Sequence, residues 1–353
     1  MDRRSFIYYG GLGSIAACSK NDQDSISLPK SEIFRWRMAT SWPPNFPGHG
    51  VSANRLARTI EELSGGRIQI EIFSAGELVP AFEVLDAVSR STIQIAHTAP
   101  VYWRGKIPSS LIYGGIPFGM TSDIFNAWLF HSDGLRLWRK AYSAMGVIPF
   151  PAGNTGQQMG GWFNREINSS DDLVGLKMRI PGLGGEVMQK VGVLPVNLPA
   201  SEIFTSLQTG AIDATEWVGP YNDMALGLQQ VAKYYYYPGW QEPSGQLELI
   251  VSNEAFYSLP KDLQKIIEIA CLSENSYLLA EFTMRNQQAL NTLKTEHNVI
   301  IKKFPNDVLT ELNKHTEIIL EELSNNDPLF EEILNSYNDF LNEINPWLEI
   351  INS

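Results

Sequence analysis

Cysteine, basic runs and long apolar stretches are all scarce in this sequence of 353 residues. It has two cysteines, and 39 acidic residues against 27 lysines and arginines give a formal net charge of −12. No HExxH motif, P-loop or zinc-type cysteine cluster is present. An acidic chain without basic runs argues against nucleic acid and anionic membranes as partners. After the first twenty residues, no uncharged apolar run is long enough to span a bilayer.

The first twenty residues differ from the rest of the chain. An arginine pair precedes a short, uncharged and mostly apolar stretch that ends at Cys18. This pattern is typical of an export signal. DRRSF resembles a twin-arginine leader, and IAAC resembles a bacterial lipobox, whose cysteine carries lipid. We expect residues 1–18 to be an export signal with a lipobox, residues 19–33 to be a linker, and the mature protein to lie in the periplasm with an N-terminal lipid tether.

Neither Cys271 nor the histidines form a recognisable catalytic set. Cys271 lies in an apolar helical run and, with the other cysteine in the leader, has no partner for an internal disulfide. We expect it to be a buried, small apolar side chain. The histidines are scattered, and a structural or surface role is the favoured interpretation for each: His49, His97, His131, His297 and His315.

Strands and helices alternate along most of the chain. From residue 34, three alternating apolar strands are separated by two helical segments, and this pattern predicts a parallel sheet covered by helices. A second α/β unit is predicted over 154–242. We therefore expect two lobes with a ligand cleft between them, the first over 34–153 and completed by about 243–258.

The last part of the chain, 259–353, is predicted to be helical. One very long helix without glycine comes first and can brace both lobes, and its apolar faces can also build a dimer contact. Three further helical stretches follow, over 306–324, 327–344 and 346–351.

Arg179 ends a short strand just before a proline and a glycine-rich loop. Its planar fork of donors fits a carboxylate or phosphate in two parallel hydrogen bonds. On these residues alone, a surface arginine whose stem packs along the sheet is the favoured interpretation.

Two glutamates accompany this arginine in the second lobe. Glu216 and Trp217 sit at the end of a predicted strand, where ligands bind in open α/β sheets, and Glu242 follows a run of tyrosines. The two carboxylates would repel an anionic ligand. A cation bound by the glutamates, an amide and the substrate would remove this repulsion. The alternative, that the glutamates are surface residues or pair with Lys177 and Lys233, stays open.

Several long motifs resemble one family of transport proteins. NTGQQMGGWF, LKMRIPGLGGEVMQKVG, SEIFTSLQTGAIDATEWVGPYND and KYYYYPGWQEP are similar to the solute-binding proteins of tripartite ATP-independent periplasmic (TRAP) transporters, in the branch that binds 2-oxo acids and lactate. The likeness runs from about residue 34 to the C-terminal helices. It implies a two-lobe periplasmic-binding-protein-like fold that closes by hinge motion, a long helix spanning both lobes, and a homodimer built by the C-terminal helices.

The resemblance also assigns site residues. Arg179 takes the role of the arginine that clamps the ligand carboxylate, and Tyr102 is a contact from the first lobe. The implied cation, sodium in preference to calcium, is bound by Gln158, Glu216, Trp217 and Glu242. The further pocket residues that the resemblance implies are Trp42, Phe46, Asn154 and Phe163.

The implied function is capture of a small monocarboxylate, such as pyruvate or lactate, and its delivery to a TRAP permease without any reaction. Two alternatives are an exported metal-dependent α/β enzyme acting on organic acids and a periplasmic sensor or chaperone of the same fold. Against the enzyme, the sequence shows no nucleophile–base motif.

Overall fold

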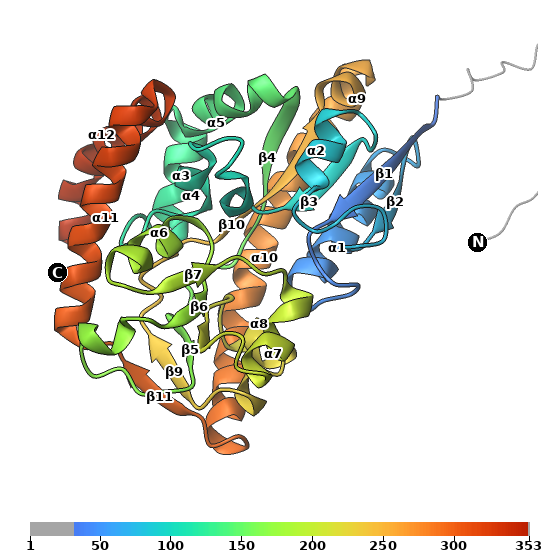
Figure 1. Cartoon of the computed structure of the whole chain (residues 1–353). Helices are drawn as coiled ribbons and strands as arrows, with labels where there is room; N and C mark the ends of the chain where they lie inside the picture. Colours follow the sequence, from blue (N-terminus) through green and yellow to red (C-terminus); the bar gives the residue numbers. More distant parts are fainter. Residues whose placement is uncertain (1–31, 352–353) are drawn as a thin grey trace, which may run out of the picture. The chain divides into compact units, whose positions relative to one another are not determined.

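The computed structural model describes residues 32–351. The predicted export signal, the lipobox and all but the end of the predicted linker therefore lie outside the described residues. From Ile33 onward, helices flank two β-sheets, and each sheet forms the basis of one lobe (Figure 1). The predicted two-lobe α/β architecture is confirmed.

The first lobe is built on a five-stranded sheet in the order β2-β1-β3-β10-β4. Its strands are β1 (Phe34–Thr40), β2 (Ile68–Phe73), β3 (Ile95–Thr98), β4 (Val147–Asn154) and β10 (Gln246–Ser252). β1 pairs in parallel with β2 and β3, as the alternation of strands and helices predicts. β10 lies antiparallel between β3 and β4, so the chain returns to the first sheet after building most of the second.

The second lobe is built on a six-stranded sheet in the order β11-β9-β5-β8-β6-β7. Its strands are β5 (Gly161–Phe163), β6 (Lys177–Arg179), β7 (Leu194–Val196), β8 (Ala214–Thr215), β9 (Tyr234–Tyr237) and β11 (Ile300–Lys303). β6 is parallel to β7 and β8, so the three strands end at one edge of the sheet. The residues that follow β6 and β8 therefore lie where ligands bind in such sheets.

Short helices cover the two sheets and connect their strands. They are α1 (His49–Leu63), α2 (Val84–Ser89), α3 (Ser110–Gly114), α4 (Ser122–His131), α5 (Gly134–Tyr142), α6 (Gly182–Lys190), α7 (Ala200–Gln208), α8 (Pro220–Ala225) and α9 (Asn253–Ser258). Within residues 32–351, four single turns of 3₁₀-helix accompany them: η1 (Pro100–Trp103), η2 (Ser143–Met145), η3 (Ser170–Leu173) and η4 (Leu228–Gln230).

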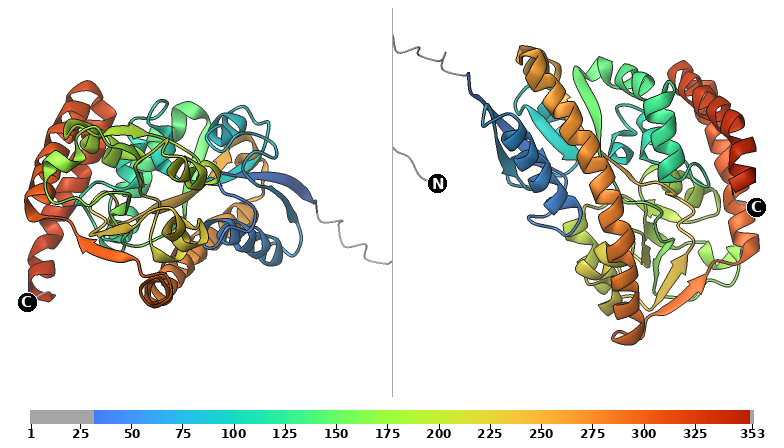
Figure 2. Two further views of the ribbon diagram at one scale, coloured as in Figure 1. Left: turned by 60° about the horizontal axis from the view of Figure 1, so that its bottom comes forward. Right: turned by 180° about the vertical axis from the view of Figure 1, so that it is seen from behind.

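The predicted long helix is α10 (Lys261–Thr295), with 35 residues. It starts directly after Pro260, which has no backbone N–H to donate. α10 packs against β4 of the first sheet and against α8 of the second lobe, and Figure 2 shows it running past both sheets. Arg55 of α1 fastens it by donating hydrogen bonds of 2.9 and 2.6 Å to the buried carboxylate of Glu274. The helix is therefore a common support for the two lobes.

Two helices, rather than the predicted three, end the described chain. α11 (Asn306–Asn326) packs against α6, and α12 (Pro328–Ile351) packs against α5. The expected break at Pro346 does not occur: α12 continues through this proline, which lies close to the exposed end of the helix. A proline so near a terminus removes one backbone hydrogen bond without ending the helix.

The described helices do not include one that is both long and apolar enough to cross a membrane. Cys271 of α10 is a free thiol, 1% exposed, and it packs with apolar side chains of the first lobe. The predicted role of this cysteine as a buried apolar residue is confirmed.

Candidate functional site

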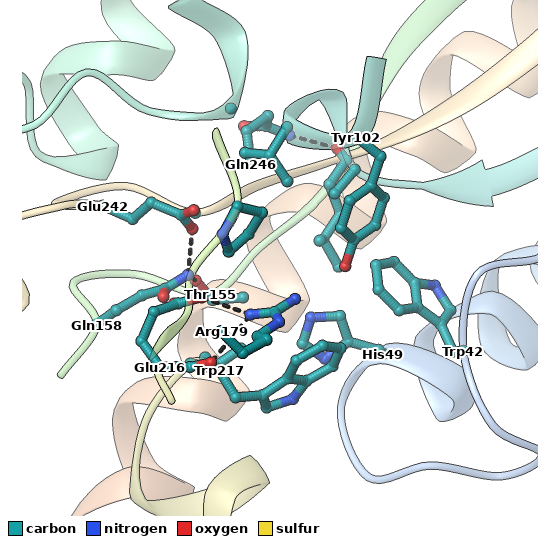
Figure 3. A pocket seen from close by; sticks show the side chains of 17 residues that line it. Trp42, His49, Tyr102, Thr155, Gln158, Arg179, Glu216, Trp217, Glu242 and Gln246 are labelled. Atoms are coloured by element: carbon teal, nitrogen blue, oxygen red, sulfur yellow. Dashed lines mark hydrogen bonds and ion pairs between the residues drawn. The ribbon is translucent and has the colours of Figure 1, made fainter. Parts of the chain in front are cut away.

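A cavity of about 30 Å³ lies where the two lobes meet. It is lined from the first lobe by residues that follow β1 and β3, from the second lobe by residues that follow β6 and β8, and by the segment that leads into β10. Figure 3 shows the guanidinium of Arg179 near the centre of this group of side chains. The lining residues are Trp42, His49, Ala99, Val101, Tyr102, Gly114, Thr155, Gln158, Arg179, Pro181, Glu216, Trp217, Val218, Glu242, Gly245, Gln246 and Leu247.

Arg179 is the last residue of β6 and is 1% exposed. Its Nε donates to the carbonyl of Leu198 at 3.2 Å, and its Nη1 donates to the carbonyl of Glu216 at 2.9 Å and to the carboxylate of the same residue. Its guanidinium also lies 4.9 Å from the ring centre of Trp217. The interpretation of Arg179 as a surface residue is therefore wrong, since both its stem and its head are buried.

The two glutamates of the site lie close together, Glu216 buried and Glu242 half-buried. Burial raises the pKa of Glu216 to about 7, against the lowering effect of Arg179. Burial and the negative charge of Glu216 raise the pKa of Glu242 well above its ordinary value. The alternative that these glutamates are surface residues or pair with lysines is wrong, because Glu216 contacts Arg179 and Glu242 accepts a hydrogen bond from Gln158.

Gln158 joins the carboxylate of Glu242 to the rest of the site. Its Nε2 donates to Oε2 of Glu242 at 2.6 Å and to the hydroxyl of Thr155 at 3.3 Å. Its Oε1 is buried without a hydrogen-bond partner in the described part of the chain. A side chain at Gly245 would collide with this arrangement, since a Cβ there would lie 2.2 Å from the Thr155 hydroxyl and 2.5 Å from Nε2 of Gln158.

The oxygen atoms of this site fit a hard cation. The negative charge of Glu216 disfavours ionisation of Glu242, and Gln158, which hydrogen-bonds to Glu242, has a buried amide oxygen without a partner in the described part of the chain. Carboxylate, amide and main-chain carbonyl oxygens are the ligands that such cations prefer. Residues 32–351 contain no group of three or more histidines, cysteines, aspartates or glutamates placed to hold a metal. The fit therefore rests on a mixed set of two carboxylates with amide and carbonyl oxygens.

An aromatic wall closes the other side of the cavity. The ring of Trp217, from the second lobe, lies 6.5 Å from Trp42, 6.1 Å from Phe46 and 5.8 Å from His49, all from the first lobe. The phenol of Tyr102 completes this side, and burial raises its pKa to about 12, so it stays a protonated donor.

The sequence matches the family described as "Bacterial extracellular solute-binding protein, family 7" over residues 38–327, which is most of the chain. The chain belongs to this family. The predicted resemblance to TRAP solute-binding proteins is confirmed, and so is the two-lobe fold that it implies.

Three proteins similar to this solute-binding protein bear on its ligand. A monocarboxylate 2-oxoacid-binding periplasmic protein of Nostoc sp. (strain PCC 7120) is 40% identical over 351 residues, 98% of this chain and 96% of that protein. A TRAP periplasmic solute-binding protein from Colwellia psychrerythraea, solved with bound calcium and pyruvate, has a TM-score of 0.88 and 40% identity over 90% of this chain and 97% of its own. One from Pseudoalteromonas atlantica, with bound sodium and pyruvate, has a TM-score of 0.88 and 39% identity over 91% and 98%.

Most of the predicted site residues of this solute-binding protein line one cavity. They are Trp42, Tyr102, Gln158, Arg179, Glu216, Trp217 and Glu242. Three others do not line it. Phe46 packs behind Trp217, Phe163 lies in the apolar core of the second lobe, and Asn154 donates hydrogen bonds to Ser244 and Gln246.

His49, Thr155 and Gln246 line the cavity but were not singled out from the sequence. His49 starts α1, and burial together with the nearby ring of His97 lowers its pKa to about 3. It is therefore a neutral, packed side chain at neutral pH. Thr155 lies inside the motif NTGQQMGGWF, directly after β4, and Gln246 starts β10, three residues after the motif KYYYYPGWQEP. The pairing of Gln246 with Asn154 brings the two together.

Proposed function

We propose that this solute-binding protein captures a small monocarboxylate, a 2-oxo acid such as pyruvate or the 2-hydroxy acid lactate, and delivers it to a TRAP permease. The buried guanidinium of Arg179 in the inter-lobe cavity carries the proposal. Among the described residues that line the cavity, it has the fixed positive charge, since His49 is neutral. One such charge suits one carboxylate. A second carboxylate would meet Glu216 and Glu242 instead.

A cation completes the proposed site. Gln158, Glu216, Glu242 and the main-chain carbonyl of Trp217 would hold it, and sodium is proposed ahead of calcium. When bound, the ion would neutralise the two carboxylates and supply positive charge for oxygens of the acid. The neutral amide of Gln158 would offer the ion its Oε1, which has no hydrogen-bond partner in the described part of the chain.

Ligand binding would stabilise the closed arrangement of the lobes. Tyr102 and Trp42 face the cavity from one lobe, and Arg179 and Trp217 face it from the other (Figure 3). Asn222 already donates a hydrogen bond of 2.8 Å across the junction to the carbonyl of Pro47. Moving a mostly open population to a mostly closed one requires a preference of about 5 kcal/mol. The two charge-assisted hydrogen bonds from the Arg179 guanidinium to the acid, together with a bridging ion, contribute a free energy of that order.

No bond is broken in this proposal. The hydroxyl of Thr155, which lines the cavity, hydrogen-bonds to the carbonyl of Gly156 and to Gln158 rather than to an imidazole. An activated nucleophile needs such a base within hydrogen-bond distance. Export to the periplasm, lipid at Cys18 and a homodimer through α11 and α12 are further parts of the proposal.

Calorimetric titration with pyruvate, in buffer that contains sodium and calcium, tests the proposal. Lys177, two residues before Arg179 on the same strand, is exposed and supplies the matched control. We expect Lys177→Ala to bind pyruvate as the native protein does. Arg179→Ala should lose at least about 3 kcal/mol of binding free energy, because the pyruvate carboxylate would be buried without the guanidinium as its partner. Equal affinity in the two variants would refute the clamp, and absence of binding by the native protein to any small 2-oxo or 2-hydroxy acid would refute the substrate class.

A further inference from the structure

Asp223 is a buried carboxylate that the proposed site does not use directly. It lies in α8, is 1% exposed, and receives four hydrogen bonds. Its Oδ2 accepts from the indole of Trp162 at 2.9 Å and from the hydroxyl of Tyr235 at 2.7 Å. Its Oδ1 accepts from the backbone N–H groups of Val218 and Gly219, both at 3.1 Å.

The four hydrogen bonds favour the ionised form of Asp223, against burial, which raises its pKa to about 6. All four groups around it are donors, and an ionised carboxylate is a pure acceptor. Within residues 32–351 no basic side chain forms an ion pair with it. Its charge is therefore not neutralised locally, and it contributes to raising the pKa of Glu216.

The two backbone N–H groups that donate to Asp223 belong to Val218 and Gly219, the residues immediately after Trp217. On the other side of Trp217, the backbone N–H of Glu216 donates to the carbonyl of Arg179 at 3.1 Å, and Nη1 of Arg179 donates to the carbonyl of Glu216 at 2.9 Å. The carbonyl of Val218 accepts from the N–H of Met159 at 2.9 Å, next to Gln158. Trp217 thus lies between Glu216 and Val218, whose main chains are both held by hydrogen bonds. Asp223 holds the main chain on the Val218 side.

We propose that Asp223 is a positioning residue for the cation site: it fixes the main chain after Trp217 and adds a third negative charge behind the two glutamates. This inference rests on the proposed function, because it requires a cation at Gln158, Glu216 and Glu242. Partners that orient a ligand from outside the coordination sphere typically change metal affinity about 10- to 100-fold when they are removed. Asp223 acts on the ion through the Trp217 carbonyl and through its field, without touching the acid.

The test uses calcium as the probe ion, because calcium takes carboxylate, amide and main-chain carbonyl oxygens as ligands. It measures how much calcium must be added back to cation-depleted protein for pyruvate to bind. Asp223→Asn keeps an oxygen for the two backbone donors and removes the charge. Its amide N–H₂ would face the indole N–H of Trp162, so the double variant Asp223→Asn with Trp162→Phe removes that conflict. Asp213→Asn is the matched control, because this carboxylate of the same lobe also accepts a backbone N–H, at 2.9 Å, but does not contact the 216–219 segment.

We expect both Asp223 variants to need about tenfold more calcium, and to reach the native pyruvate affinity once calcium saturates, while Asp213→Asn behaves as the native protein. Calcium midpoints equal to that of the native protein would overturn the inference. A loss of pyruvate affinity that saturating calcium does not restore would also overturn it, because it would show a purely structural role. If the native protein binds pyruvate without any cation, the cation itself is absent from the function, and that failure is visible before any variant is compared.

Discussion

Glu248 should make the free energy of unfolding fall as the pH rises. This residue of β10 is fully buried in the first lobe, where its Oε1 accepts hydrogen bonds from the indole of Trp103 at 2.6 Å and from the hydroxyl of Tyr142 at 3.2 Å. Its Oε2 has no partner among the described residues. Burial raises the pKa of Glu248 from 4.5 to about 8, with the two hydrogen bonds opposing this shift.

The sign and size of the effect follow from these two pKa values. Between about pH 4.5 and pH 8 the unfolded chain loses the Glu248 proton, whereas the folded chain keeps it, so stability declines with rising pH. The slope is about 1.4 kcal/mol per pH unit, which amounts to about 3 kcal/mol at pH 7. Glu248→Gln resembles the protonated acid in shape and does not titrate, so it should remove this loss.

Urea unfolding of the ligand-free native protein and of Glu248→Gln, at a series of pH values from about 5 to 8, measures the effect. We expect the variant to gain on the native protein steadily across this range and to exceed it by about 3 kcal/mol at pH 7. The reasoning would fail if the difference between the two proteins did not depend on pH.

Two further predictions concern the ligand site. Gly245→Ala should weaken pyruvate binding, because its Cβ would push Thr155 and Gln158 apart, whereas Gly105→Ala, where a Cβ meets no atom within 4 Å, should not; calorimetric affinities that match would contradict this. Because the pKa of Glu216 is raised to about 7, and a bound cation needs ionised carboxylates, cation affinity should increase from about pH 6 to about pH 8 with release of protons. Titrations in buffers of different ionisation enthalpy count these protons, and a count of zero would rule out the coupling.

The regular parts of the fold could be predicted from local patterns. The alternation in 34–40 and 68–73 predicts two strands, and the structure pairs them in parallel as β1 and β2. β11 was not predicted as a strand, because it is a short edge strand whose pairing with β9 depends on residues far away in sequence. β8 is shorter than predicted, since the chain leaves the ladder before Glu216, whose carbonyl is taken by Arg179.

The site was much harder to predict from the residues alone. Arg179 alternates with apolar neighbours and looks like a surface residue on its strand. Its burial comes from Leu198 and Glu216, which follow it by 19 and 37 positions, so no local pattern reports it. His49 gave no signal because its place in the cavity depends on aromatic rings from both lobes. The resemblance to a family supplied the residues that local chemistry could not.

A crystal structure of the protein grown with pyruvate and calcium tests the central claim most directly, because the ion can be identified from its anomalous scattering. The account predicts the pyruvate carboxylate on the guanidinium of Arg179, and the ion bound by Gln158, Glu216, Glu242 and the carbonyl of Trp217 on the opposite side. A pyruvate whose carboxylate lies away from Arg179, or an ion outside this set of oxygens, would contradict it.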